Sequence, residues 1–198
     1  MKSSLALLLA LVMTMTLFAG CRRTQNNDNT TQNTDSSTAQ NAPESALQIL
    51  QNIWDTYGEE EKFSIIGGNF ENAVDNAPGN FDMAFIENLA GNLAIPQELL
   101  TQVSSAALMV HMMNANTFTA GAVQLKEDSD PAAFASTMQG ALQSHPWICG
   151  IPETMLIATF EGRYVLIAFG AADLVGPFQS KLQQVYPDAN IRHSENIG

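Results

Sequence analysis

The strongest constraint on the fold is a pair of apolar, β-rich runs separated by a short turn. Residues 154–160 read TMLIATF and residues 163–169 read RYVLIAF, with Glu161-Gly162 between them. Val, Ile, Thr, Phe and Tyr favour strands, and a two-residue turn containing glycine joins adjacent antiparallel strands. We therefore predict a β-hairpin. Because both runs are almost wholly apolar, we expect them to lie centrally in a sheet, with helices over one face.

A second strand pair is predicted upstream of this hairpin. The stretches 103–113 (VSSAALMVHMM) and 117–126 (TFTAGAVQLK) are strand-like, and Asn114-Ala115-Asn116 between them is typical of a turn. Residues 190–194 are a candidate for a short edge strand. The two pairs together predict a mainly antiparallel, four-stranded sheet.

Apolar residues also recur at helical spacing between these strands and after them, which predicts helices packed on the sheet. Ser129-Asp130-Pro131 is a strong helix start, because a capping residue is followed by proline at the first helical position. Pro177 predicts either a kink in the last helix or a start near Gly176. The predicted helices span residues 43–57, 82–93, 96–102, 131–144 and 171–186. The predicted fold class is a single α+β domain over residues 43–198.

The N-terminus has the pattern of a bacterial lipoprotein signal. A positively charged start, Met1-Lys2, is followed by an apolar or threonine-bearing run of 14 residues, Leu5–Phe18. At about 1.5 Å per residue, a helix of this length is too short to cross a hydrocarbon core about 30 Å thick. The small pair Ala19-Gly20 then precedes Cys21, so residues 1–20 are predicted to be a signal peptide and Cys21 to be the site of lipid attachment. The alternative is ordinary secretion, with Cys21 as a free thiol.

Residues 21–42 are predicted to be a lipidated cysteine followed by a polar tether. The stretch 22–41 (RRTQNNDNTTQNTDSSTAQN) has no large apolar residue, so it cannot bury enough surface to offset the entropy of ordering. As a flexible coil, twenty residues span roughly 25 Å on average. The predicted location is therefore the extracytoplasmic face of the cell membrane, with acyl chains such as palmitate as the anchor.

The charge of the mature chain limits its partners. Without residues 1–20, which contain Lys2, the chain has seven basic and twenty acidic residues and a net charge of −13. This argues against nucleic acid and against electrostatic docking on anionic lipid, so contact with the membrane is expected only through Cys21. Cys149 is the other cysteine, and with Cys21 acylated it has no intramolecular partner. We expect its thiol to be buried as a small hydrophobe.

Several groups of residues have the composition of ligand sets, but a structural role is preferred for each. His111 is expected to be a packed or surface residue of its strand. Met109, Met112 and Met113 have the composition of a soft-metal site, but core packing is the commoner use of methionine.

Two groups of acidic residues are also candidates. The oxygen atoms of Asp75, Asn76, Asn80 and Asp82 could bind calcium, but a plain turn is preferred. A cation patch at Glu59, Glu60 and Glu61 is less expected than a solvated helix end.

His145 and Cys149 are the remaining candidates for chemistry, as a nucleophile–base or metal pair. A spacing of four residues brings such groups together on a helix, and two prolines with a glycine make residues 145–152 (HPWICGIP) a loop instead. No third member of a catalytic set is recognisable. We therefore predict no catalytic residue, no metal site and no cofactor.

Two stretches carry a resemblance to a known family: residues 111–134 (HMMNANTFTAGAVQLKEDSDPAAF) and residues 154–170 (TMLIATFEGRYVLIAFG). They resemble a family of bacterial lipoproteins that is catalogued as a domain of unknown function and is frequent in Gram-positive anaerobes. The resemblance covers roughly residues 45–190 and includes the lipid-anchored layout with a polar tether. It implies a fold and a location at the cell envelope, and it implies no mechanism.

The function expected from the sequence is that of a non-catalytic binding or accessory module at the cell envelope. The alternatives are an envelope enzyme with an active site that has no sequence motif, and the solute-binding component of a transporter. Such receptors usually enclose their ligand between two lobes, for which roughly 155 residues is small. The partner is left open between an envelope protein and a small ligand, and exposed apolar patches would favour a protein.

Overall fold

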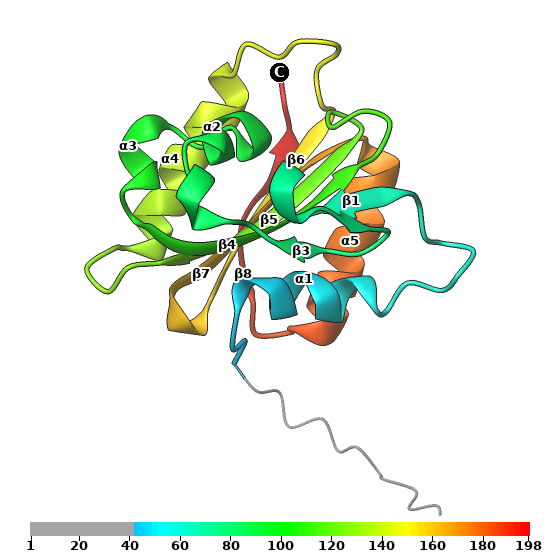
Figure 1. The fold of residues 1–198 in the computed structure, drawn as a ribbon, viewed down its shortest axis with the longest axis horizontal. Coiled ribbons are helices and arrows are strands. Elements are labelled where there is room, and N and C mark those ends of the chain that lie inside the picture. Colours follow the sequence, from blue (N-terminus) through cyan, green and yellow to red (C-terminus); the bar gives the residue numbers. More distant parts are fainter. Residues whose placement is uncertain (1–41) are drawn as a thin grey trace, which may run out of the picture. The chain divides into compact units, whose positions relative to one another are not determined.

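A computed structural model describes residues 42–198 of the chain, which lie within one compact unit (Figure 1). The predicted signal peptide, the predicted lipid site Cys21 and residues 22–41 of the predicted tether lie outside the described residues. None of the helices in this part of the chain combines the length and the apolar character that a membrane span requires.

The described residues build an open, antiparallel sheet of eight strands, so the prediction of four strands is wrong. The strand order is β2-β1-β4-β5-β7-β6-β8, and β3 also pairs with β4. The strands are β1 (Ile65–Gly67), β2 (Val74–Asp75), β3 (Gly79–Asn80), β4 (Val103–His111), β5 (Phe118–Leu125), β6 (Thr154–Phe160), β7 (Tyr164–Gly170) and β8 (Asn190–Asn196). The predicted four are the long central strands, and the predicted edge strand is β8. The missed strands β1 to β3 have only two or three residues each, which is too short to show a periodic pattern.

The predicted hairpin is confirmed, but its turn is longer than predicted. Phe160 pairs with Tyr164, so three residues, Glu161–Arg163, connect β6 to β7. Gly162 and Arg163 have φ values of 72° and 66°, in the left-handed region. Three-residue hairpin loops commonly place a residue there, and glycine does so without steric cost.

The helices differ from the predicted ones mainly at their ends. They are α1 (Ala46–Trp54), α2 (Asn88–Leu93), α3 (Gln97–Leu100), α4 (Pro131–Ser144) and α5 (Ala172–Val185), with 3-10 turns η1 (Phe70–Asn72), η2 (Met83–Phe85) and η3 (Glu161–Arg163). The α4 prediction is confirmed, and the Asp130 side chain accepts from the Ala132 N–H at its start. The predicted helix 82–93 is in fact a 3-10 turn followed by a short helix. Because α5 begins at Ala172, the alternative start near Gly176 is wrong.

Helices cover both faces of the sheet, which corrects the expectation of one covered face. Helices α2, α3 and α4 pack on one face and α1 and α5 on the other (Figure 1). Along β7, Val165, Ile167 and Phe169 face the first group, whereas Tyr164, Leu166 and Ala168 face the second. Burial on both faces is why the runs 154–160 and 163–169 are almost wholly apolar.

The topology explains the two layers. Helix α4 connects β5 to β6 across β7, and α5 connects β7 to β8 across β6. Both crossovers move the same way along the sheet, but β5 and β7 run in opposite directions. Two crossovers of the same hand must then place their helices on opposite faces, as observed.

The long strands give the domain two distinct ends. At one end, β5 begins at Phe118, β6 begins at Thr154 and β7 ends at Gly170. At the other end lie the β6–β7 turn and the start of the described chain, where the Tyr164 hydroxyl donates to the Glu44 carbonyl at 2.9 Å. Seven residues of β6 separate the two ends, about 20 Å at the rise of an extended strand. We call them the loop end and the turn end.

Candidate functional site

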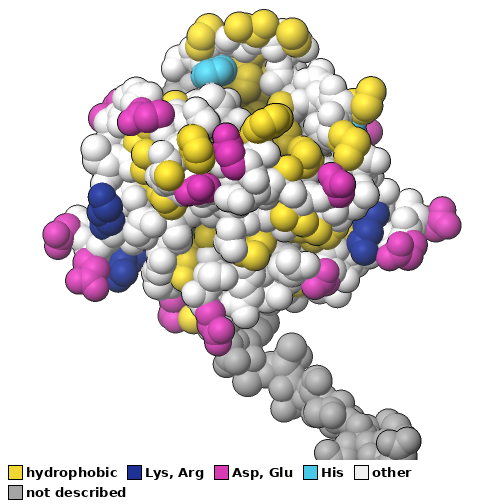
Figure 2. Space-filling model, in the orientation of Figure 1, with side chains coloured by type: hydrophobic (Ala, Val, Ile, Leu, Met, Phe, Trp, Pro, Cys, Tyr) yellow, Lys and Arg dark blue, Asp and Glu magenta, His cyan; other side chains and the backbone are white. Residues whose placement is uncertain are grey.

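Two loops at the loop end carry a concentration of exposed apolar side chains. Residues 112–117 connect β4 to β5, and residues 145–153 connect α4 to β6. Seven large apolar side chains are exposed among the described residues, and four of them lie here: Met112, Met113, Ile148 and Ile151. Figure 2 shows hydrophobic side chains along the top of the molecule, where the 145–153 loop lies. Single exposed apolar residues are ordinary, but a concentration of them marks an interaction surface. We call residues 112–117 and 145–153 the loop-end surface.

Asn116 ties the two loops together. Its side-chain amide donates to the Ile148 carbonyl at 2.7 Å and to the Gly150 carbonyl at 2.6 Å. Its own backbone N–H donates to the side-chain oxygen of Asn114 at 2.9 Å. The backbone that presents Ile148 and Ile151 is therefore held from the neighbouring loop.

The base of the loop-end surface is part of the sheet. Gly170 accepts a hydrogen bond from the Glu153 N–H at 2.9 Å, and Ala171 donates to the Thr117 carbonyl at 2.9 Å. Gly170 has a φ of 152°, and a Cβ atom there would collide with the Thr117 carbonyl. Only glycine permits this close approach of β5 and β7.

Asn116 lines two small cavities. One, of about 220 Å³, is lined by Val110, Asn116, His145, Trp147 and Phe169 among others. The second, of about 200 Å³, is lined by Asn114, Asn116, Cys149, Ile151 and Glu153 among others. The Glu153 carboxylate accepts from the Ala172 N–H at the start of α5, at 2.9 Å. A helix N-terminus stabilises a carboxylate placed in this way.

His145 and Cys149 lie in the predicted loop but do not form a pair. The His145 ring packs on Trp147 at 4.4 Å between centroids, and the Trp147 indole donates to the Leu142 carbonyl at 3.3 Å. His145 lines the first of these cavities and Cys149 the second. The expectation of a buried thiol is wrong, because Cys149 is exposed at a left-handed turn with a φ of 64°.

His111 is a packed residue at the end of β4, one of the two structural roles expected for it. Its Nδ1 atom accepts from the backbone N–H groups of Met113 at 3.3 Å and Asn114 at 3.4 Å, so it caps the turn after β4. Its ring stacks on Phe63, with the centroids 5.9 Å apart. The methionines do not converge: Met109 is fully buried beneath α1 and α5, whereas Met113 is 84% exposed.

The acidic and amide residues near β2 and β3 also have structural roles. Asn76 has a φ of 56° in a turn, and the Asp82 side chain caps η2 by accepting from the Ala84 N–H at 2.9 Å. Within residues 42–198, no group of three or more His, Cys, Asp and Glu side chains is arranged to hold a metal ion.

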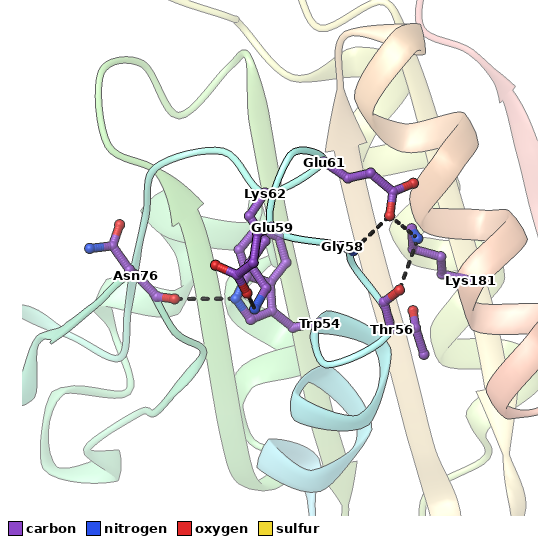
Figure 3. Close-up of polar contacts among 8 residues, drawn as sticks. All are labelled: Trp54, Thr56, Gly58, Glu59, Glu61, Lys62, Asn76 and Lys181. Carbon is purple, nitrogen blue, oxygen red and sulfur yellow. Dashed lines mark hydrogen bonds and ion pairs between the residues drawn. The ribbon is translucent and has the colours of Figure 1, made fainter.

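The acidic run after α1 is partly neutralised by two lysines (Figure 3). Glu61 pairs with Lys181 of α5 at 2.9 Å and accepts from the Gly58 N–H at 2.7 Å, and Glu59 pairs with Lys62 at 3.2 Å. The hydrogen bond from Lys181 holds the pKa of the Glu61 carboxyl below its ordinary value. The Lys181 contact could not be predicted from the sequence, because it joins residues 120 positions apart.

Beneath this ion pair lies a buried tyrosine without a hydrogen-bond partner. Lys181 Nζ lies 4.4 Å from the centroid of the Tyr57 ring. The Tyr57 hydroxyl is buried and has no partner among the described residues. Burial, with a smaller contribution from the charge of Glu61, raises the pKa of Tyr57.

Comparison with known proteins adds no relative to this description. No protein-family model, no curated protein and no solved structure matches the chain. The function is therefore inferred from the geometry and chemistry of the residues themselves.

Proposed function

We propose that this protein is a lipid-anchored binding module of the cell envelope, which contacts a protein partner through the loop-end surface. The observation that carries the proposal is the exposure of Met112, Met113, Ile148 and Ile151 on two loops that Asn116 joins. Apolar side chains held in water by a fixed backbone are costly unless a partner covers them. The signal-like residues 1–20 and the following Cys21 support the location.

A protein is a better occupant of this surface than a lipid bilayer. The described chain starts at the turn end, about 20 Å along the strands from the loop-end surface. Residues 42–198 contain five basic and eighteen acidic residues, a net charge of −13. Anionic headgroups repel such a domain. A tether that joins the turn end also leaves the loop end free to point away from the membrane.

A different protein is likewise a better occupant than a second copy of this chain. Two domains that each carry a net charge of −13 repel one another. A partner with a basic rim around an apolar contact would gain from the same charge. The two cavities that Asn116 lines, of about 220 and 200 Å³, lie below the usual size of small-molecule sites, roughly 300–1,000 Å³. A third cavity, of about 480 Å³, borders His145 and Pro146 but includes none of the four exposed apolar side chains of the loop-end surface.

The proposal is tested by photo-crosslinking in intact cells. A photoreactive amino acid replaces Ile148 in the full chain, and the matched control places it at Gln183, an exposed position of α5. We expect one adduct with a second protein from position 148, identified by mass spectrometry, and none from position 183. The adduct should be lost on Ile151→Asp. Adducts only with lipid or with a second copy of the chain, or equal adducts from both positions, would contradict the proposal.

The anchor is tested separately by Cys21→Ser. The full chain should be found in the membrane fraction and carry an acyl mass on Cys21, and the variant should be released from that fraction without the mass. An unmodified Cys21 in the wild-type chain would contradict the lipid anchor, and it would not affect the proposal for the loop-end surface.

A further inference from the structure

A separate cleft lies at the turn end, next to the start of the described chain. It has a volume of about 320 Å³, within the range of small-molecule sites, which is roughly 300–1,000 Å³. Its walls come from residues 42–43, from the end of β6 with the turn that follows, and from residues 186–189 between α5 and β8.

Two aromatic rings set at right angles form part of the wall. The centroids of Phe160 and Tyr186 lie 5.3 Å apart, and the ring planes meet at 87°. The Tyr186 ring is fixed, because its hydroxyl accepts from the Asn52 amide at 2.9 Å. Pro43 and Pro187 add further rigid apolar surface to the lining. The rings and the two prolines therefore form a rigid apolar part of the lining.

Two carboxylates border these rings. Glu161 and Asp188 both line the cleft and are exposed, and neither takes part in an ion pair among the described residues. The arginines near this end have other partners: Arg163 Nε donates to the Leu125 carbonyl and Arg192 Nε donates to the Thr159 hydroxyl. The cleft thus combines aromatic rings with two negative charges, on a domain whose net charge is −13.

We infer that this cleft binds the substituted ammonium group of an organic cation. Aromatic rings attract a cation through their negative faces, and quaternary ammonium groups are recognised in this way because they are large and weakly hydrated. A bare metal ion is a poorer fit, because residues 42–198 contain no cluster of three or more His, Cys, Asp and Glu side chains arranged to hold one. The site does not depend on the loop-end surface or on acylation of Cys21.

The same headgroup chemistry can come from a membrane lipid or from a free solute. The cleft adjoins Ala42 and Pro43, where the chain continues toward Cys21, so a lipid headgroup is within reach if Cys21 is acylated. Binding of choline tests recognition of the headgroup itself. Binding to vesicles of phosphatidylcholine then shows whether the headgroup comes from a membrane lipid or from a free solute.

The test is calorimetric titration of the full chain, purified in a nonionic detergent, with choline. The comparison ligand is its uncharged isostere, in which carbon replaces the nitrogen. We expect saturable one-to-one binding of choline and at least about tenfold weaker binding of the isostere. Equal affinity for the two ligands, or no saturable binding of choline, would overturn the inference.

Variants locate the binding. Phe160→Leu keeps apolar volume and removes the ring, and it should weaken choline binding by about tenfold. Glu161→Gln with Asp188→Asn changes only exposed side chains, and it should weaken binding several-fold and reduce its salt dependence. The matched control Phe70→Leu changes a phenylalanine that is 95% exposed elsewhere, and its affinity should equal that of the wild type. Unchanged binding in both cleft variants would refute the assignment.

Binding to lipid vesicles identifies whether the cation belongs to a membrane lipid or to a free solute. Flotation with phosphatidylcholine vesicles is compared for Cys21→Ser and for Cys21→Ser with Phe160→Leu, so that the anchor does not contribute. Flotation that depends on Phe160 assigns the site to a lipid headgroup. Choline binding without flotation assigns it to a free solute.

Discussion

The side-chain amide of Asn116 donates to the backbone carbonyl of Ile148 at 2.7 Å, across 32 residues of sequence. The same nitrogen donates to the Gly150 carbonyl at 2.6 Å. The other hydrogen bonds that tie the 145–153 loop to the rest of the domain lie near its ends, at Trp147 and Glu153, so the bonds from Asn116 are those that hold residues 148–150. The exposed side chains of this loop are therefore positioned largely by one residue of the neighbouring loop.

Asn116→Ala should loosen the 145–153 loop without unfolding the domain. Two hydrogen bonds at a partly exposed site contribute about 1–2 kcal/mol together, so the free energy of unfolding should fall by about that amount. Amide hydrogen exchange at residues 148–151 should become faster, while exchange in β6 and β7 stays the same. Asn92→Ala is the control, since this exposed side chain makes no hydrogen bond among the described residues. Equal exchange in the two variants would show that Asn116 does not hold the loop.

Tyr57→Phe should stabilise the domain. The Tyr57 hydroxyl is buried without a partner, and removing such a group recovers its desolvation cost, about 1 kcal/mol. Tyr186→Phe is the control with the opposite expected effect. The Tyr186 hydroxyl accepts a hydrogen bond from the Asn52 side chain, so its removal should lower the unfolding free energy by about 1 kcal/mol. Urea unfolding measures both changes. A loss of stability in Tyr57→Phe would mean that its hydroxyl has a partner in solution.

Stability should fall at alkaline pH. Burial raises the pKa values of Tyr57, Tyr164 and Tyr186 above their ordinary value near 10. Between the ordinary and the raised pKa, the unfolded chain loses these protons and the folded chain keeps them, so the unfolded state is favoured as pH rises above about 10. The urea midpoint should therefore be lower at pH 11 than at pH 9, because the loss begins near the ordinary pKa of about 10, and the difference should be smaller in Tyr57→Phe. A midpoint that rises over this window would contradict the direction of these shifts.

Gly170→Ala should be strongly destabilising. A Cβ atom at this φ of 152° would collide with the Thr117 carbonyl, so β5 and β7 would have to separate at the base of the loop-end surface. We expect a loss of about 3 kcal/mol in unfolding free energy, measured by urea denaturation. Gly140→Ala is the control, since a Cβ there in α4 meets no atom within 4 Å and should add about 1 kcal/mol. Equal effects at the two glycines would contradict this account of Gly170.

The long elements were predictable because their residues repeat a local pattern. Each strand of the hairpin is a nearly unbroken apolar run of seven residues, and helix α4 repeats apolar residues at helical spacing, with a turn or cap at each boundary. Strands β1 to β3 could not be predicted in this way, because the pairing of β1 and β3 with β4, and of β2 with β1, is decided by tertiary contact. The expectation of helices over one face was wrong, because a strand with one solvated face alternates and these two runs do not.

The candidate surfaces were less predictable, because the type of a residue does not determine whether its side chain is exposed to solvent. Residues 145–152 were correctly predicted to be a loop, but Cys149 was expected to be buried and is exposed. The meeting of this loop with Asn116 follows from the strand register, in which Phe118 pairs with Gly170 and Gly170 pairs with Thr154. That register is visible only once the order of the strands is known.

The most direct measurement of the central claim compares photo-crosslinking from Met113 with photo-crosslinking from Ile148, one on each loop of the proposed surface. The measurement uses the full chain in intact cells and repeats both positions with Ile151→Asp, a change at a side chain that is 67% exposed. The account predicts that both positions give adducts with the same protein and that Ile151→Asp reduces both. Adducts with different proteins, or a reduction at neither position, would show that the two loops do not form one binding surface.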